Sequence, residues 1–378
     1  MGYAYRDSAR RIRIEPMNVQ ASEITNAQHE MFERLALAIH TKRVDARTAL
    51  HRAGFSSSLL GFIPRDACLP GFPNTWREIA FLNATCGAKP SHRCLRPHPL
   101  DFDLVTLGIR PAALIHGPTN ELVQIQSEAR ILGIACAISM IEITPTADPQ
   151  LGNYSNLSNT RQIAQVGSSG WRALFISKDP ERMVLSWLAE YMGWNSLLGA
   201  CLGYPQCCIK HFEENWHKAS EEHGGDIGIM QLKAARVGQQ YDWQMNIFAR
   251  YTGRVLVDHF PCDFDCSDTA TQAFVLAQTL EILCPDVLSD IQQRCQTTVV
   301  WTDNEGVLLL NSRHNKPVVT PANADGPIAS VLQRGEKVAV TSSGALSIGN
   351  RLVDGRMLRF DSPSKKSINV DLPRVEAL

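Results

Sequence analysis

The spacing of apolar and polar residues changes along the chain, and these changes divide it into three parts. In the first part, apolar residues recur at helical spacing over residues 26–41, whereas residues 55–100 are rich in Pro, Gly, Ser and Cys. Recurrence every three to four residues is typical of one helix face, and Pro and Gly clusters are typical of loops. Residues 1–102 therefore predict an irregular, partly helical N-terminal cap.

The second part, residues 103–296, begins with strands and helices in alternation. Residues 120–132 have helical spacing. Short apolar runs typical of strands occupy residues 112–116, 134–143 and 172–177. Such alternation favours a small parallel or mixed sheet with helices on its faces. Residues 194–295 then have a mostly helical pattern.

In the third part, residues 297–378, short strand patterns alternate with turns rich in Gly, Asn and Asp. Its length is within the usual range of a small domain, so we expect a β-rich C-terminal module. The fold class predicted for the whole chain is α/β, or α+β overall. It would combine a small mixed sheet with flanking helices, a helical segment that carries cysteines, and this module.

The charge balance bears on which binding partners the protein is expected to have. The 378 residues include 37 Lys and Arg against 38 Asp and Glu, a net charge of -1. Proteins that hold long nucleic acids or anionic membranes are normally basic, so we expect neither partner. The start of the chain lacks the apolar segment of a secretion signal, which predicts a cytoplasmic protein. The oligomeric state is left open.

The eleven cysteines are the unusual part of the composition. Thiols stay reduced in the cytoplasm, so clustered cysteines there indicate metal binding or catalysis rather than disulfides. The common phosphate-binding loop, dinucleotide fingerprint, zinc-protease motif and hydrolase nucleophile motif are all absent from the sequence.

The first cysteine motif is Leu-Gly-Tyr-Pro-Gln-Cys-Cys-Ile-Lys-His-Phe at residues 202–212. Its Gly can end one helix and its Pro can begin the next, which places Cys207 and Cys208 in a first helical turn. The positive helix terminus stabilises a thiolate there. His211 lies four residues after Cys207, so the two could bind one ion. Cys208 shares its helix face with Phe212. We therefore expect Cys207 to be the more accessible cysteine, although both could instead be small buried side chains.

The second motif is Asp-His-Phe-Pro-Cys-Asp-Phe-Asp-Cys-Ser-Asp at residues 258–268. It supplies His259, Cys262 and Cys266 just before a predicted helix at residues 269–283. Compact groups of thiol and imidazole ligands suit zinc or an iron–sulfur cluster. The alternative is a structural turn whose thiols have no special role.

A helical hairpin could bring the two motifs together. The predicted metal ligands are then Cys207, Cys208, His259, Cys262 and Cys266. Asn246 and Arg250 lie four residues apart on a predicted helix between the motifs, where they could face a pocket or form an exposed polar row. The candidate catalytic residues are Cys207, His211, Asn246 and Arg250.

The combination of Leu-Gly-Tyr-Pro-x-Cys-Cys-x3-Phe, Asn-x3-Arg and His-Phe-Pro-Cys-x3-Cys resembles a prokaryotic family described as a domain of unknown function. The resemblance covers residues 172–283. It implies that these positions form the functional site, and it brings no established reaction with it.

The reading that these patterns favour is a metalloprotein enzyme with a zinc or iron–sulfur centre. Its substrate would be a small molecule or a modified peptide or tRNA. Two other classes stay open: a non-catalytic binding or regulatory protein with a structural zinc, and a thiol–disulfide redox protein. A second group, Cys86 and Cys94 with His92 and His98, has loose spacing that favours a plain surface loop over a metal site.

Overall fold

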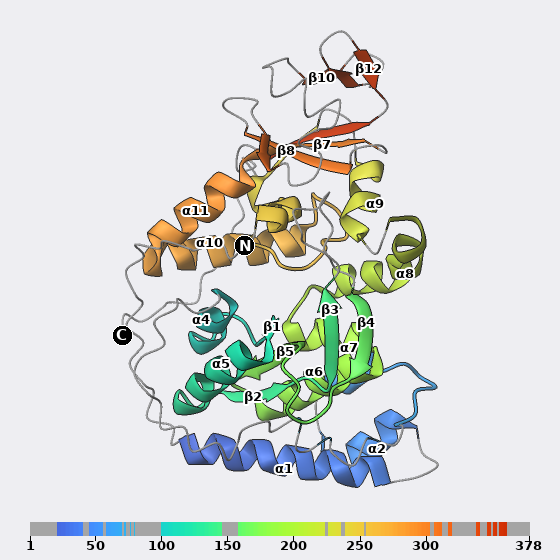
Figure 1. Ribbon diagram of the computed structural model, residues 1–378, viewed down its shortest axis with the longest axis vertical. Coiled ribbons are helices and arrows are strands. Elements are labelled where there is room, and N and C mark those ends of the chain that lie inside the picture. The colour runs from blue at the N-terminus through green and yellow to red at the C-terminus, as the bar shows by residue number, and fades with distance from the viewer. Residues whose placement is uncertain are drawn as a thin grey trace. The chain divides into compact units, whose positions relative to one another are not determined.

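The computed structural model describes the chain in two compact units (Figure 1). The described residues are 21–40, 45–55, 58–69, 72, 76, 79, 100–145, 158–223, 226–235, 239–252, 255–302, 306–311, 317–319, 338–340, 346–348, 351–353 and 355–360. Among the described residues, those up to Ile209 belong to the first unit and those from Lys210 onward belong to the second. This boundary falls inside helix α8 (Gln206–His223), so one unbroken helix starts in the first unit and continues in the second.

The first unit is built on a five-stranded sheet with β5 at its centre. Its strands are β1 (Ala112–Pro118), β2 (Ala135–Ile138), β3 (Ile141–Pro145), β4 (Ser158–Ile163) and β5 (Trp171–Ser177). One edge of β5 pairs with β1, and the other pairs with β2 and then β3, while β4 pairs with β3. All these pairs are antiparallel. The β1–helix–β2 alternation therefore does not give neighbouring parallel strands, because β5 lies between β1 and β2.

Helices pack around this sheet, and several of them come from the N-terminal part of the chain. They are α1 (Ala21–His40), α2 (Ala46–Arg52), the 3-10 helix η1 (Ser58–Phe62), α4 (Leu100–Thr106), α5 (Thr119–Ile131), α6 (Pro180–Met192) and α7 (Asn195–Leu202). The buried Trp187 of α6 packs edge-on against Phe32 of α1 and donates to the carbonyl of Ile138 in β2. Helix α1 is thus part of the core of the first unit.

The second unit contains helices followed by strands. It comprises α8, α9 (Ile227–Ala234), β6 (Gln240–Tyr241), η3 (Trp243–Met245), η4 (Ile247–Thr252), α10 (Ser267–Leu283), α11 (Pro285–Cys295), β7 (Thr297–Thr302), β8 (Gly306–Asn311), β9 (Pro317–Val319), β10 (Val338–Val340), β11 (Leu346–Ile348), β12 (Arg351–Val353) and β13 (Arg356–Phe360). One sheet has the order β6-β13-β7-β8-β9, and β10, β11 and β12 form another. In the larger sheet β13 runs parallel to β6 and antiparallel to β7.

The mixed α/β fold class is therefore confirmed, and the C-terminal strands belong to the same unit as the helices before them. The side chain of Phe360 in β13 contacts the rings of Tyr241 and Phe264, at centroid distances of 5.7 and 5.5 Å. Among the helices that the structure describes, none has both the length and the apolar character that crossing a membrane requires.

Candidate metal centre

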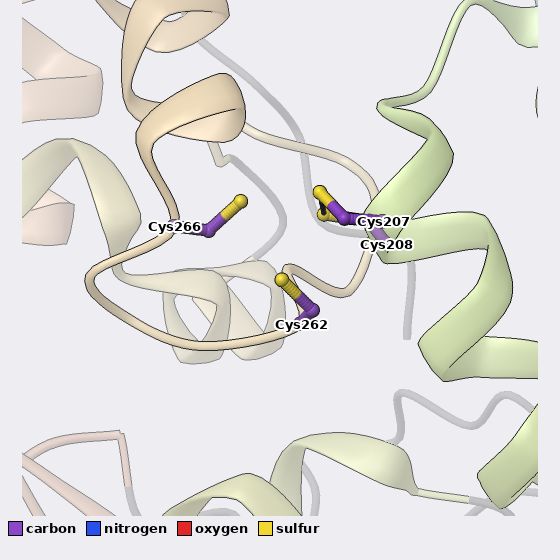
Figure 2. Close-up of side chains that lie close together, drawn as sticks. All are labelled: Cys207, Cys208, Cys262 and Cys266. Atoms are coloured by element: carbon purple, nitrogen blue, oxygen red, sulfur yellow. Dashed lines mark hydrogen bonds between the residues drawn. The ribbon is translucent and has the colours of Figure 1, made fainter.

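Four cysteines from the two sequence motifs lie together. The Sγ atoms of Cys207, Cys208, Cys262 and Cys266 are all within 4.8 Å of one another. Figure 2 shows the two sulfurs at the start of α8 turned toward the sulfurs of the 262–266 segment. The arrangement brings together thiols from two helix starts that the sequence separates widely, and a group this compact is able to hold a metal ion.

A tight connection places the first pair of cysteines. Helix α7 ends at Gly203, whose φ of 82° is in the left-handed region that glycine adopts without strain. The carbonyl of Pro205 then accepts hydrogen bonds from the amides of Cys208 and Ile209, both at 3.0 Å, and begins α8. Cys207 and Cys208 therefore lie in the first turn, where the positive end of the helix dipole favours thiolates.

The second pair lies on a turn that leads into α10. The amide of Cys266 donates to the carbonyl of Asp263 at 3.0 Å, and the Asp263 side chain accepts from the amide of Asp265 at 2.8 Å. Cys266 is the N-cap residue of α10, and its carbonyl accepts from the amide of Ala270. This turn brings Cys262 close to Cys266 and places Cys266 at a second positive helix terminus.

Aromatic and polar contacts hold this turn in place. Phe260 packs against Phe212 of α8, with ring centroids 6.0 Å apart, and the Arg250 guanidinium lies 4.3 Å from its centroid. The carbonyl of Pro261 accepts a hydrogen bond from the side chain of Gln231 in α9. The Phe212–Phe260 contact joins α8 directly to the segment that carries the second pair. Phe260 belongs to the second sequence motif, whereas Gln231 lies outside both motifs and was not predicted to support the site.

Exposure differs strongly within the group. Cys208 and Cys266 are buried, Cys262 is intermediate, and Cys207 is the least buried of the four, at the boundary between intermediate and exposed. The expectation that Cys207 is the more accessible of the adjacent pair is thus confirmed. Both sulfurs nevertheless face the group, since they lie 3.8 Å apart and within 4.8 Å of the sulfurs of Cys262 and Cys266. A single χ1 rotation moves each sulfur, so two adjacent cysteines can turn toward one another although their Cα–Cβ bonds diverge.

The two histidines of the motifs lie outside the group of four sulfurs. The Nε2 atom of His259 is 3.0 Å from the hydroxyl of Thr269 in α10, a contact that anchors the segment before Cys262. The Nδ1 atom of His211 is 3.3 Å from the amide nitrogen of Asn215, and its Nε2 atom is buried without a hydrogen-bond partner. Burial lowers the pKa of His211 below its usual value, against the opposing effects of Glu214 and Asp263.

Asn246 and Arg250 make contacts within the protein that account for them structurally. The expected helix with both residues on one face is wrong, because η3 and η4 are separate 3-10 helices with Asn246 between them. Asn246 is buried and donates to the carbonyl of Cys295 at 2.7 Å and to the hydroxyl of Thr297 at 2.9 Å. Arg250 forms an ion pair with Asp226, the N-cap of α9, at 2.6 Å.

Three of the described cysteines outside the group are buried. Burial raises the pKa of Cys136 to about 11 and the pKa values of Cys201 and Cys295 to about 12, so these thiols stay protonated near neutral pH. Cys86, His92, Cys94 and His98 lie outside the described residues.

Comparison with known proteins found no relative of this chain. No family model matches the sequence, and no curated protein and no solved structure matches it. The likeness of the two cysteine motifs to a prokaryotic domain family stays a prediction. What can be said of function therefore depends on the chemistry of the four cysteines.

Proposed function

We propose that the four cysteines bind a single divalent metal ion, with zinc preferred, and that this ion ties the start of α8 to the start of α10. The observation that carries the proposal is the mutual separation of the four sulfurs, within 4.8 Å. With Zn–S bonds of about 2.3 Å, sulfurs on one tetrahedral ion lie about 3.8 Å apart. The Cys207–Cys208 separation of 3.8 Å fits that arrangement.

The same separation favours one ion over a four-iron cluster. In such a cluster each cysteine binds a different iron atom, so the ligand sulfurs surround a core of iron and sulfide and lie farther apart than ligands of one ion. Four thiolates also fill a tetrahedral ion completely. Closed sites of this kind are structural, whereas catalytic zinc keeps one position for water or substrate.

The surroundings fit a metal–thiolate centre. Such a centre is negatively charged overall, because four thiolates outnumber the charges of a divalent ion. The first turn of α8 and the N-cap of α10 place positive helix ends beside it. The closed set of four thiolates supports a non-catalytic binding or regulatory protein over a metalloenzyme. In such a protein, metal binding contributes to folding.

Metal analysis of the full chain, purified anaerobically with a reductant, tests the proposal. We expect colourless protein with one zinc per chain, and a cobalt-substituted form with the absorption of tetrahedral thiolate ligation. Cys262→Ser should lose most of the bound zinc. Cys284→Ser is the matched control, since Cys284 has intermediate burial like Cys262 but is not in the group, and it should keep its zinc.

Two results would overturn the proposal. Brown protein that contains iron and acid-labile sulfide would replace the single ion with a cluster. Protein that binds neither zinc nor cobalt, with all four thiols titratable, would favour thiol–disulfide chemistry.

A further inference from the structure

His211 carries an unexplained polar atom beside the candidate metal centre. It lies one helical turn after Cys207 in α8, and its Nε2 atom is buried without a hydrogen-bond partner. An unsatisfied buried polar group costs about 1–3 kcal/mol. Such atoms are rare in folded proteins, and each one needs a reason.

The contact with Asn215 determines which ring nitrogen carries the proton. The Asn215 amide nitrogen donates to the backbone carbonyl of His211 at 2.8 Å, which fixes its NH₂ group toward the ring. That NH₂ group is 3.3 Å from Nδ1 and can only donate, so Nδ1 must accept. In a neutral ring the proton then resides on Nε2, which makes the buried atom a donor rather than a metal ligand.

A metal-loaded centre would provide an acceptor for this donor. Residues four apart on a helix have Cβ atoms about 5–6 Å apart and share one face. His211 therefore shares a helix face with Cys207, whose thiolate would carry negative charge in a metal-loaded centre. Nε2 makes no hydrogen bond to that sulfur in this structure. The carboxylates of Glu214 and Asp263 act on the ring electrostatically, but neither accepts a hydrogen bond from Nε2.

We propose that His211 donates its Nε2–H to the metal-bound thiolate of Cys207, and that this hydrogen bond sets the metal affinity and the reactivity of that sulfur. The inference rests on the proposed metal centre and makes His211 a positioning residue, not a ligand. Cys207 is the least buried member of the group, so it is the sulfur that a soft electrophile reaches first.

Alkylation by iodoacetamide gives the reactivity a direct measure. A lone pair of the Cys207 thiolate forms the new S–C bond while the C–I bond breaks and iodide leaves with its electron pair. A hydrogen bond withdraws electron density from sulfur and slows this step. Removing the donor should therefore make Cys207 react faster in the metal-loaded protein.

The substitution test compares two histidines of α8. His211→Phe should weaken metal affinity by about 10–100-fold, the usual effect of removing a partner of a metal ligand. It should also shift the sulfur-to-cobalt absorption band and speed the alkylation of Cys207. His211→Gln, which restores an N–H donor, should recover part of each effect. The exposed His217 provides the control, and His217→Phe should match the unmodified chain in all three measurements.

A measurement on the unmodified chain removes any dependence on variant folding. In ¹¹³Cd-loaded, ¹⁵N-labelled protein we expect a scalar coupling between cadmium and the His211 Nε2 proton, transmitted through the hydrogen bond. If the chain binds metal but the coupling is absent and His211→Phe changes nothing, this inference is wrong and the metal centre stands. Nitrogen ligation in the cobalt spectrum would make His211 a ligand and overturn the inference. A chain that binds no metal would instead overturn the proposed function.

Discussion

At the residue scale, Arg172 in β5 is a completely buried cation. Its guanidinium donates to the side chain of Ser168 and to the carbonyl of Gln165, and it lies 3.6 Å from the carboxylate of Glu142 in β3. Its Nε and Nη1 atoms are buried without a partner. Burial lowers the pKa of Arg172, and Glu142 opposes this effect. The carboxylate therefore compensates a charge that has no access to water.

We expect Glu142→Gln to destabilise the first unit by about 2–4 kcal/mol, since it leaves the buried cation uncompensated. Because Glu142 is partly exposed, the loss should fall toward the lower end of this range. Urea unfolding measures the change. The Arg172→Met, Glu142→Leu double variant should recover most of the lost stability. A double variant that is less stable than Glu142→Gln would show that the charge pair itself stabilises the fold.

Single residues were also where the sequence was most informative about the site. The Gly and Pro around Tyr204 were sufficient to place Cys207 and Cys208 in a first helical turn, because helix starts and ends are chosen by local backbone geometry. The contacts of His259 and Asn246 could not be predicted in the same way. Their partners, Thr269, Cys295 and Thr297, are set by tertiary packing, and nothing in the spacing of the motifs encodes them.

At the scale of elements, the α7–α8 connection determines where the first cysteine pair lies. Gly203 has a φ of 82°, and a Cβ atom there would be 2.6 Å from Cγ of Pro111. The turn therefore needs glycine both for its backbone conformation and for the close approach of Pro111. A larger residue must displace either this turn, with the start of α8, or the ring of Pro111.

We expect Gly203→Ala to lower the free energy of unfolding by about 2–3 kcal/mol, of which the left-handed conformation accounts for about 1–2 kcal/mol. It should also weaken metal binding, because Cys207 and Cys208 follow directly. Gly167 has the same φ of 82° with nothing within 4 Å of its Cβ position, so Gly167→Ala isolates the backbone effect. Equal losses in thermal unfolding for the two variants would mean that the Pro111 contact has no effect.

Elements were predicted better than their pairing. The strand at 112–118 and the helix after it agree with the sequence pattern, but the single strand expected at 134–143 is interrupted between β2 and β3. Ser139 lies at this break, where its hydroxyl accepts from the amide of Ile141 and donates to Glu190 of α6. Apolar periodicity describes which face of a strand is buried. It does not say which strand is the neighbour, and so the central place of β5 was not predictable.

At the scale of the whole molecule, buried thiols link stability to alkaline pH in both units. Cys136 and Cys201 lie in the first unit and Cys295 in the second. Burial raises their pKa values from 9.0 to about 11, 12 and 12 respectively. The unfolded chain therefore ionises first as pH rises. Stability contributed by these thiols is complete below pH 9 and declines until the pH reaches the folded-state pKa values.

Each of these thiols should cost about 1.4 kcal/mol of stability for each pH unit above 9 within this window. Denaturant unfolding at pH 8 and pH 10 under reducing conditions measures the decline. Between pH 8 and pH 10, Cys201→Ala should lose less unfolding free energy than the unmodified chain. The difference should equal the contribution of one thiol. An identical decline would show that Cys201 is not held protonated by burial.

The α/β class and the meeting of the two cysteine motifs followed from patterns within short segments. The division into two units did not, because the boundary falls inside the continuous helix α8, where no change of composition marks it. Pairing of β6 with β13 likewise joins segments more than a hundred residues apart. Contacts between residues so far apart in the sequence depend on the packed structure rather than on any local propensity.

The position of β13 between β6 and β7 has a consequence for biosynthesis. A ribosome releases all four cysteines of the centre well before it reaches Phe360, whose ring packs on Phe264 between Cys262 and Cys266. Until then the nascent chain carries the turn with Cys262 and Cys266 without this ring contact. The reduced thiols are thus open to oxidants and to competing soft metals during elongation, when folding by long-range contacts is still incomplete. Early metal capture, or protection by a chaperone, would shorten that vulnerable interval.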